Sequence, residues 1–197
     1  MAKAQEKEKE REKEDKTKRK KFSDPKWGAE QLKEIGIFKN FTVKELMRIY
    51  KIGEILNVKQ EAHVVIEGET TRGLYIIFHG TVSVYKNDNV TGAMHKIAYM
   101  EEGSAFGELS LFDDAPRSAT VAADNECYLF QLDTKNFEAL LKKEGHEFAS
   151  RFYKTCAEDM AFRFREINAD YISSQQLLWK YALRKANDGN EEKVPQD

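Results

Sequence analysis

The chain has 197 residues, a formal net charge of −2 and two cysteines. This length suits one domain with a real hydrophobic core, and the near-neutral charge argues against nucleic acid as the main partner. The longest apolar run, 74–78, is far too short for a membrane span. Two cysteines are too few for a disulfide scaffold, and no secretory signal precedes the domain, so we expect a cytoplasmic protein.

The first 21 residues form a highly charged segment. They carry ten basic and six acidic side chains and no aromatic residue. Such a segment cannot bury apolar area, so residues 1–21 are predicted to be a disordered tail or a transient charged helix. The interspersed glutamates favour a solubilising tail over an electrostatic arm for membrane or nucleic acid.

Structure is predicted to begin at residue 22, with short helices over 22–52. Asp24 and Pro25 fit the N-cap and the first position of a helix. Residues 42–45, TVKE, fit a capping box that opens a second helix. The apolar residues recur at helical spacing in both segments, and they are Trp27, Leu32, Ile35, Phe38, Leu46, Ile49 and Tyr50.

The spacing of the apolar residues changes at Gly53, and residues 53–133 are predicted to form a β domain. Short β-rich runs alternate with turn residues such as those at 67–68, 87–89 and 102–103. The runs are 55–58, 64–66, 74–78, 82–85, 95–99, 119–121 and 127–130. Short strands at this spacing indicate an antiparallel sandwich or barrel.

One stretch within this region, residues 106–121, has the features of an anion site. Gly107 permits a backbone conformation that other residues resist, and it allows close approach to a ligand. The backbone amides of Glu108, Leu109 and Ser110 would then form a helix N-terminus, which attracts anions.

Two charged side chains in this stretch narrow the ligand class. Arg117 offers a planar fork of donors suited to phosphate. Glu108 does not suit a phosphate, but a carboxylate can accept from the hydroxyls of a ribose. A phosphate and a sugar hydroxyl together indicate a nucleotide.

Residues 106–121, FGELSLFDDAPRSATV, resemble the phosphate-binding cassette of cyclic nucleotide-binding domains. These domains occur in cAMP-dependent protein kinase regulatory subunits, cyclic-nucleotide-gated channels and bacterial cAMP receptor proteins. The resemblance extends more thinly over about 37–143. It implies an α+β, mainly β fold: an eight-stranded antiparallel jelly-roll barrel flanked by short N-terminal helices and a long C-terminal helix.

The resemblance also implies roles for individual residues. Arg117 pairs with the cyclic phosphate, Glu108 accepts from the ribose 2′-hydroxyl, and the amides from Gly107 through Leu109 to Ser110 complete the cradle. Ser118 can add a hydroxyl. Because this residue is small, it favours cAMP over cGMP.

Further residues match family positions near the base and sugar. These residues are Val84, Ile97 and Ala98. An alternative interpretation, nearly as good, is that they are ordinary residues of the barrel core. Arg163, or Phe162 beside it, is a candidate for closing over the base from the C-terminal helix. The equally weighted alternative is that Arg163 is an ordinary arginine on the exposed face of the helix and contacts no ligand.

The family pattern is broken in two places. Residues 70–73, TTRG, replace the usual Gly-Asp turn, and Ser104 stands where Asp is common. Both departures are expected to change loop shape rather than phosphate contacts.

Residues 134–186 are predicted to be helical. Thr134 is the expected cap of a helix that stops at Gly145. Residues 146–188 contain neither Gly nor Pro, so they permit one helix of about 60 Å. A bend or break is expected at 168–170, and residues 187–197 are expected to be a polar tail.

Catalytic and metal sites are disfavoured. The four histidines, His63, His79, His95 and His146, are scattered, whereas a cupin-like metalloenzyme needs a cluster. No Ser, His and Asp arrangement is present. We therefore expect no enzyme, no metal and no cofactor.

The sequence thus predicts a stand-alone cyclic nucleotide receptor that binds cAMP, with cGMP as the alternative ligand, and lacks a DNA-binding or catalytic segment. The signal is expected to pass through the C-terminal helix to an unidentified effector or a homodimer. Phe148, Phe152 and Met160 are expected to pack near the barrel, which leaves the later apolar residues for an interface. A barrel that has lost its ligand and acts as a protein-interaction scaffold is the alternative.

Overall fold

The computed structural model describes residues 16–18, 20–88 and 90–191. They fall into two compact units, 1–155 and 156–197. The predicted charged tail lies largely outside the described residues, although 16–18 and 20–22 are helical.

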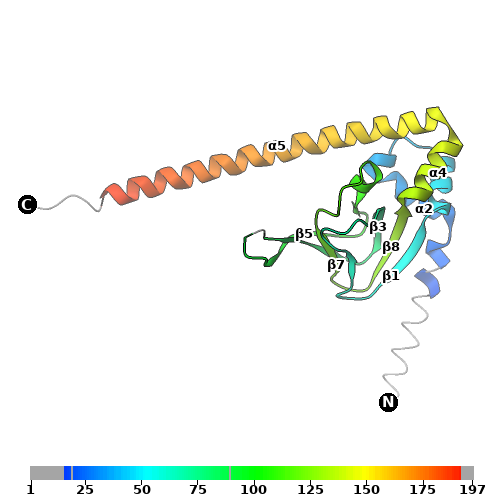
Figure 1. Ribbon diagram of the computed structural model, residues 1–197, viewed down its shortest axis with the longest axis horizontal. Helices are drawn as coiled ribbons and strands as arrows, with labels where there is room; N and C mark the ends of the chain where they lie inside the picture. Colours follow the sequence, from blue (N-terminus) through cyan, green and yellow to red (C-terminus); the bar gives the residue numbers. More distant parts are fainter. Residues whose placement is uncertain (1–15, 19, 89, 192–197) are drawn as a thin grey trace, which may run out of the picture. The chain divides into compact units, whose positions relative to one another are not determined.

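The elements follow one another as short helices, strands and two further helices (Figure 1). The helices are α2 (Pro25–Lys33), η1 (Gly36–Phe38), α3 (Val43–Lys51), η2 (Glu108–Leu111), α4 (Thr134–Glu144) and α5 (His146–Glu191). The strands are β1 (Glu54–Val58), β2 (His63–Val65), β3 (Gly73–His79), β4 (Val82–Asn87), β5 (Met94–Met100), β6 (Ala105–Phe106), β7 (Thr120–Ala123) and β8 (Cys127–Asp133).

The strands form two four-stranded antiparallel sheets. Their orders are β1-β8-β3-β6 and β2-β7-β4-β5. All seven predicted β runs are strands, and β6 is the additional one. Within the described residues no hydrogen-bonded ladder joins the two sheets into a closed barrel, so the structure shows two sheets where a closed barrel was expected.

The core lies between the sheets, where apolar side chains from both meet. Its buried members are Val65, Tyr75, Ile77, Val82, Phe106, Val121, Ala123, Cys127 and Leu129. Their removal from water is the main stabilising contribution of the β domain, at about 1.5–3 kcal/mol for each large side chain.

The N-terminal helices have the predicted caps. The side chain of Asp24 accepts from the Lys26 amide at 2.9 Å, with Pro25 at the first helical position. Thr42 and Glu45 form the capping box that opens α3. These caps satisfy amides that a helix start otherwise leaves unpaired.

The helices cover one side of the β1-β8-β3-β6 sheet. The ring of Tyr50 in α3 stacks on Phe130 of β8, with centroids 5.0 Å apart. Figure 1 shows α2 and α4 beside strands β1 and β8. The same sheet therefore has the core on one face and helices on the other.

The cap of α4 differs from the prediction. Asp133, not Thr134, is the N-cap, since its carboxylate accepts from the Asn136 amide at 3.0 Å. Thr134 is the first helical residue, and its hydroxyl donates to the Ser110 carbonyl at 3.1 Å. The Thr134 hydroxyl therefore bonds to η2, which belongs to the predicted anion site, and the Asp133 carboxylate caps α4. Gly145 ends α4 with φ 91°, as expected.

Helix α5 is continuous through 168–170, so no break occurs at the predicted weak point. It runs to Glu191, past the predicted end at 186, and residues 192–197 of the predicted polar tail lie outside the described residues. Its first ten residues belong to the first unit. There Phe148 and Phe152 are buried in an aromatic cluster with Phe38, Phe41 and Phe137.

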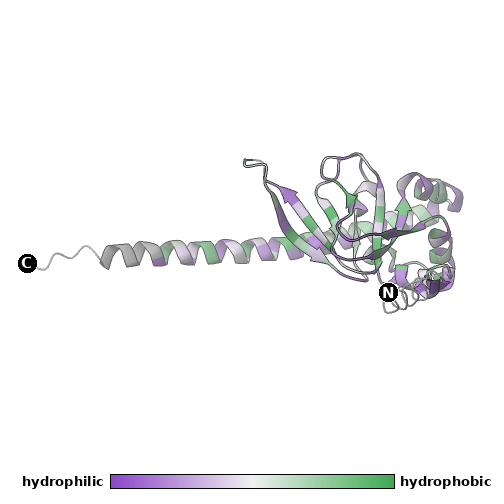
Figure 2. Cartoon of the chain, turned by 90° about the horizontal axis from the view of Figure 1, so that it is seen from below, coloured by the Kyte–Doolittle hydropathy of each residue, from purple (hydrophilic) through white to green (hydrophobic). Residues whose placement is uncertain are grey.

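In the second unit, α5 carries many exposed apolar side chains. Each has 56–75% of its surface accessible, and they are Phe162, Phe164, Ile167, Tyr171, Ile172, Leu177, Leu178, Trp179, Tyr181 and Leu183. Figure 2 shows hydrophobic segments interspersed with hydrophilic ones along this helix. No helix in the described ranges combines the length and apolar character needed to cross a lipid bilayer.

Candidate anion-binding site

The predicted site is built on a left-handed turn. Gly107 has φ 77° and ψ 13° and precedes η2. A Cβ at this position would lie 2.5 Å from Arg117 Nη1 and 2.7 Å from the Gly73 carbonyl. Only glycine satisfies both the conformation and the space, as the sequence indicated.

Arg117 is held by neutral oxygen atoms. Its Nη2 donates to the Gly73 carbonyl at 3.0 Å, and its Nε donates to Thr71 Oγ1 at 3.3 Å. Its Nη1 lies 3.4 Å from Ser110 Oγ and 3.5 Å from the Gly107 carbonyl. The guanidinium is therefore oriented from two separate segments of the chain, 71–73 and 107–110.

The charge of Arg117 is buried without a carboxylate partner. The residue is 8% exposed, and none of the ion pairs among the described residues includes it. Burial lowers its pKa, although Tyr75 and Glu69 oppose the shift. Arg117 Cζ lies 5.6 Å from the centroid of the Tyr75 ring. A buried cation whose hydrogen-bond acceptors are all neutral oxygens is a candidate site for an anion.

The segment 70–73 contributes more than the sequence indicated. It was expected to affect loop shape alone, but Thr71 and Gly73 both accept hydrogen bonds from Arg117. These contacts join residues 44–46 positions apart in sequence, and the expectation that this segment makes no phosphate contact stays a prediction. Spacing along the chain gives no signal for such contacts.

Ser110 lies at the centre of the site rather than at its surface. It is 5% exposed, and its hydroxyl accepts from the Gly73 amide at 3.0 Å. The hydroxyl also donates to the Gly107 carbonyl at 2.7 Å. The Ser110 amide donates within the turn, to the Gly107 carbonyl at 3.3 Å, so it is already engaged in the structure.

The other cassette residues line the outer side of this turn. Glu108 is half-buried at the start of η2, and Leu109 is 53% exposed. Ser118 follows Arg117 and is exposed, while its carbonyl accepts from Lys86 Nζ at 2.6 Å. The structure thus brings Gly107 and Arg117 together, and Glu108 directly follows Gly107.

The residues predicted near the base lie on the neighbouring sheet. Val84 in β4 is partly buried against the core and pairs directly with Ala98 in β5. Ile97 lies at the register shift that follows this pair and is 60% exposed. Val84 also pairs with Val121, which comes four residues after Arg117, so the strand after the cassette is adjacent to these positions.

Arg163 lies in the second unit. Its Nε contacts Asp159 Oδ2 at 2.9 Å, one helical turn earlier. Its contact with a ligand stays a prediction.

A second polar cluster supports the end of the cassette and was not predicted. Lys86 Nζ contacts Glu67 Oε1 at 2.5 Å as well as the Ser118 carbonyl. Glu67 also accepts from the Asn87 amide at 2.9 Å. The pKa of Glu67 is lowered, first by its hydrogen bond from Lys86.

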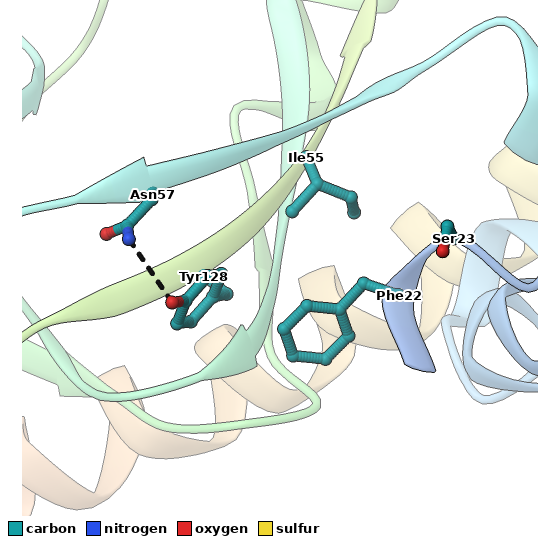
Figure 3. A pocket seen from close by; sticks show the side chains of 5 residues that line it. All are labelled: Phe22, Ser23, Ile55, Asn57 and Tyr128. Carbon is teal, nitrogen blue, oxygen red and sulfur yellow. Dashed lines mark hydrogen bonds between the residues drawn. The ribbon is translucent and has the colours of Figure 1, made fainter. Parts of the chain in front are cut away.

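A pocket elsewhere on the first unit has a different character. Its volume is about 380 Å³, and Figure 3 shows Phe22, Ser23, Ile55, Asn57 and Tyr128 around it. Asn57 Nδ2 donates to the Tyr128 hydroxyl at 3.2 Å. All five side chains are uncharged. Among the described residues, no group of three or more His, Cys, Asp and Glu side chains could hold a metal ion.

Comparison with known proteins identifies the domain around this site. Residues 55–144 match the family model described as the cyclic nucleotide-binding domain. The match includes Gly107, Glu108 and Arg117. Residues 55–144 therefore belong to the cyclic nucleotide-binding domain family. This family consists of regulatory and sensor domains, and no catalytic family is indicated.

Curated relatives of the domain are regulatory proteins and channels. The cAMP-dependent protein kinase regulatory subunit of Mucor circinelloides f. lusitanicus is 34% identical over 110 residues, 56% of this chain and 25% of that protein. The human potassium/sodium hyperpolarization-activated cyclic nucleotide-gated channel 2 is 33% identical over 114 residues, 58% of this chain and 12% of the channel. The similarity therefore spans a quarter or less of these relatives.

Solved structures show the same fold. The cAMP-bound PfPKA-R matches with a TM-score of 0.53 and 29% identity, over 58% of this chain and 40% of that one. The catabolite activator protein of Thermus thermophilus matches with a TM-score of 0.60 and 22% identity, over 69% of this chain and 61% of that one. At that identity the second match concerns the fold alone.

Proposed function

We propose that this cyclic nucleotide-binding domain is a receptor for a 3′,5′-cyclic mononucleotide, with cAMP bound more tightly than cGMP. The observation that carries the proposal is the buried guanidinium of Arg117, which has no carboxylate partner among the described residues. A singly charged phosphate diester would neutralise it. In the absence of an anion the burial of this charge is unfavourable.

The surrounding residues fit the rest of such a ligand. Arg117 would bind the phosphate through its remaining donor capacity, and Glu108, at the adjacent turn, would accept from the ribose 2′-hydroxyl. The amides beside Gly107 and the Ser118 hydroxyl add donors near the phosphate. Val84, Ile97 and Ala98 supply apolar surface for the sugar and base.

The preference for cAMP rests on Ser118. This side chain is small and exposed beside Arg117. We expect Ser118→Thr to narrow or invert the preference by placing a branched hydroxyl next to the phosphate site. The cytoplasmic location expected from the sequence remains part of this proposal.

The second unit is proposed to transmit the signal as a homodimer. Phe164, Ile167, Tyr171, Leu178 and Tyr181 recur at three- to seven-residue intervals, as in the seam of a coiled coil, and all are exposed. Twofold homodimers are the commonest assemblies, and a second copy offers a matching seam. Ligand would shift the helix between two placements only by its different affinity for each.

Calorimetric titration of the full chain with cAMP, cGMP and cyclic di-GMP tests the receptor function. We expect saturable binding of one cAMP per chain, weaker binding of cGMP and none of cyclic di-GMP. Absence of binding by either mononucleotide would contradict the proposal and favour the alternative, a ligand-free scaffold. Tighter binding of cGMP would contradict only the base preference.

A further inference from the structure

The side chain of Arg72 joins three segments around the anion site. Its Nε donates to the Ser110 carbonyl at 3.3 Å, and its Nη1 contacts Asp114 Oδ1 at 2.8 Å. Its Nη2 lies 3.7 Å from Glu138 Oε1 in α4. One guanidinium therefore links η2, the loop before Arg117, and α4.

Ser110 connects Arg72 to Arg117, because it contacts both arginine side chains. Its hydroxyl accepts from the Gly73 amide at 3.0 Å and lies 3.4 Å from Arg117 Nη1. The Gly73 carbonyl accepts from Arg117 Nη2 at 3.0 Å. Gly73 directly follows Arg72. Arg72 contacts the Ser110 carbonyl, and Gly73 contacts both the Ser110 hydroxyl and the Arg117 guanidinium.

The two arginines differ in charge environment. Arg117 faces neutral oxygens, whereas Arg72 has two carboxylates within 4.0 Å and a side chain that is 29% exposed. The charge of Arg72 is thus already compensated, which makes it a poor second ligand for a phosphate. Its geometry suits the restraint of a loop instead.

Of the three contacts that Arg72 makes, the one with the Ser110 carbonyl is the most important for the anion site. Asp114 is 88% exposed, and ion pairs this accessible contribute little by themselves. A guanidinium can bind a carbonyl and a carboxylate at once in fixed geometry, whereas a lysine ammonium is a single flexible point of contact. Thr134 donates to the same carbonyl, so removal of Arg72 should loosen the turn without unfolding it.

We propose that Arg72 is a positioning residue of the phosphate site: it holds Ser110, and through Ser110 the guanidinium of Arg117, in the orientation that binds the anion. The proposal rests on the receptor function above for its effect on affinity. The orientation of Arg117 itself is a property of the ligand-free protein, and it can be measured separately.

The test compares three full-length proteins: wild type, Arg72→Ala and Arg48→Ala. Arg48 is a matched control, because its Nη2 contacts Glu144 Oε2 at 2.9 Å on a part of the first unit remote in sequence from the cassette. In ligand-free protein, ¹H–¹⁵N spectra report the Gly73 amide and the Arg117 Nε–H group. Calorimetry with cAMP then reports affinity, and thermal unfolding reports the integrity of the fold.

We expect both resonances to shift in Arg72→Ala and to stay in place in Arg48→Ala. The loss of a charge-assisted hydrogen bond that orders the site should weaken cAMP binding by about tenfold. Arg72→Lys should recover only part of this loss. Unchanged resonances in Arg72→Ala would overturn the positioning role whatever the ligand proves to be. Shifted resonances with affinity within about twofold of wild type would overturn its role in binding, while binding by wild type keeps the receptor proposal intact.

Discussion

Gly107 is required for two reasons, its left-handed backbone conformation and the space that its missing Cβ leaves. Its φ of 77° favours glycine, and its missing Cβ leaves room for Arg117 Nη1 and the Gly73 carbonyl. Gly103 has a similar φ of 86° but open space around it. The two positions therefore form a natural pair for comparison.

We predict that Gly107→Ala both destabilises the fold and weakens nucleotide binding, because the new methyl group displaces Arg117. Gly103→Ala should lose only about 1–2 kcal/mol of unfolding free energy, the cost of a left-handed conformation, and should keep its affinity. Urea unfolding and calorimetry with cAMP measure the two quantities. Equal effects of the two substitutions on affinity would refute the close-approach role of Gly107.

At the scale of elements, the first unit depends on polar links between α3 and the start of α5. Glu45 Oε1 accepts from Arg151 Nη2 at 2.6 Å, and Glu45 Oε2 accepts from the Thr42 amide at 2.8 Å. Burial raises the pKa of Glu45, but the hydrogen bonds from Thr42 and the charge of Arg151 outweigh this effect and hold it below its usual value.

This lowered pKa predicts a pH dependence of stability. A carboxyl group with a lower pKa in the folded state stabilises the fold above its unfolded value of 4.5, and the contribution is lost as pH falls through the folded value. We expect Glu45→Gln to reduce the unfolding free energy by about 1–2 kcal/mol at pH 7. The gap to wild type should shrink below pH 4.5.

Chemical unfolding at pH 7, 5 and 3 provides this comparison. Glu34→Gln removes a charge at an exposed position at the end of α2 and serves as the control. A gap between wild type and Glu45→Gln that is the same at all three pH values would contradict the account.

The elements show which parts of the site the sequence could predict. The turn at Gly107 and the arginine ten residues later are local, so their pattern within one short segment was sufficient. The partners of Arg117 at Thr71 and Gly73, and the link from Arg72 to Ser110, join residues 38–46 positions apart. They depend on the register of β3, which no local pattern specifies.

The α4 cap illustrates a second limit. Asp133 and Thr134 are both good N-cap residues, and local preference cannot decide between them. The choice depends on Ser110, whose carbonyl takes the Thr134 hydroxyl. The antiparallel strands are confirmed, whereas closure into one barrel is not, because the described strands form two separate four-stranded sheets.

At the scale of the whole molecule, the exposed apolar residues of α5 are the main unexplained surface. Leu177, Leu178 and Trp179 have 58–67% of their surface accessible. Apolar patches of this kind usually mark an interface. The homodimer proposed above would cover them with the same residues of a second copy.

We predict that the full chain is a dimer in solution and that a shortened chain ending at Glu158 is a monomer. Tyr171→Glu with Leu178→Glu in the full chain should also give a monomer, because it places like charges opposite each other in the seam. Multi-angle light scattering with and without cAMP measures the mass of each. Monomeric full-length protein under both conditions would rule out self-association through this helix.

The central claim is that the uncompensated charge of Arg117 binds the phosphate of a cyclic nucleotide, and its most direct test is calorimetric titration of wild type and Arg117→Ala with cAMP. We expect the variant to lose about 2–5 kcal/mol of binding free energy, the cost of leaving a buried charge unpaired. Arg48→Ala is the control and should bind like wild type.

Glu108→Gln should lose less binding free energy than Arg117→Ala, since a neutral amide still accepts from a hydroxyl. Affinity of Arg117→Ala within about threefold of wild type would contradict the account.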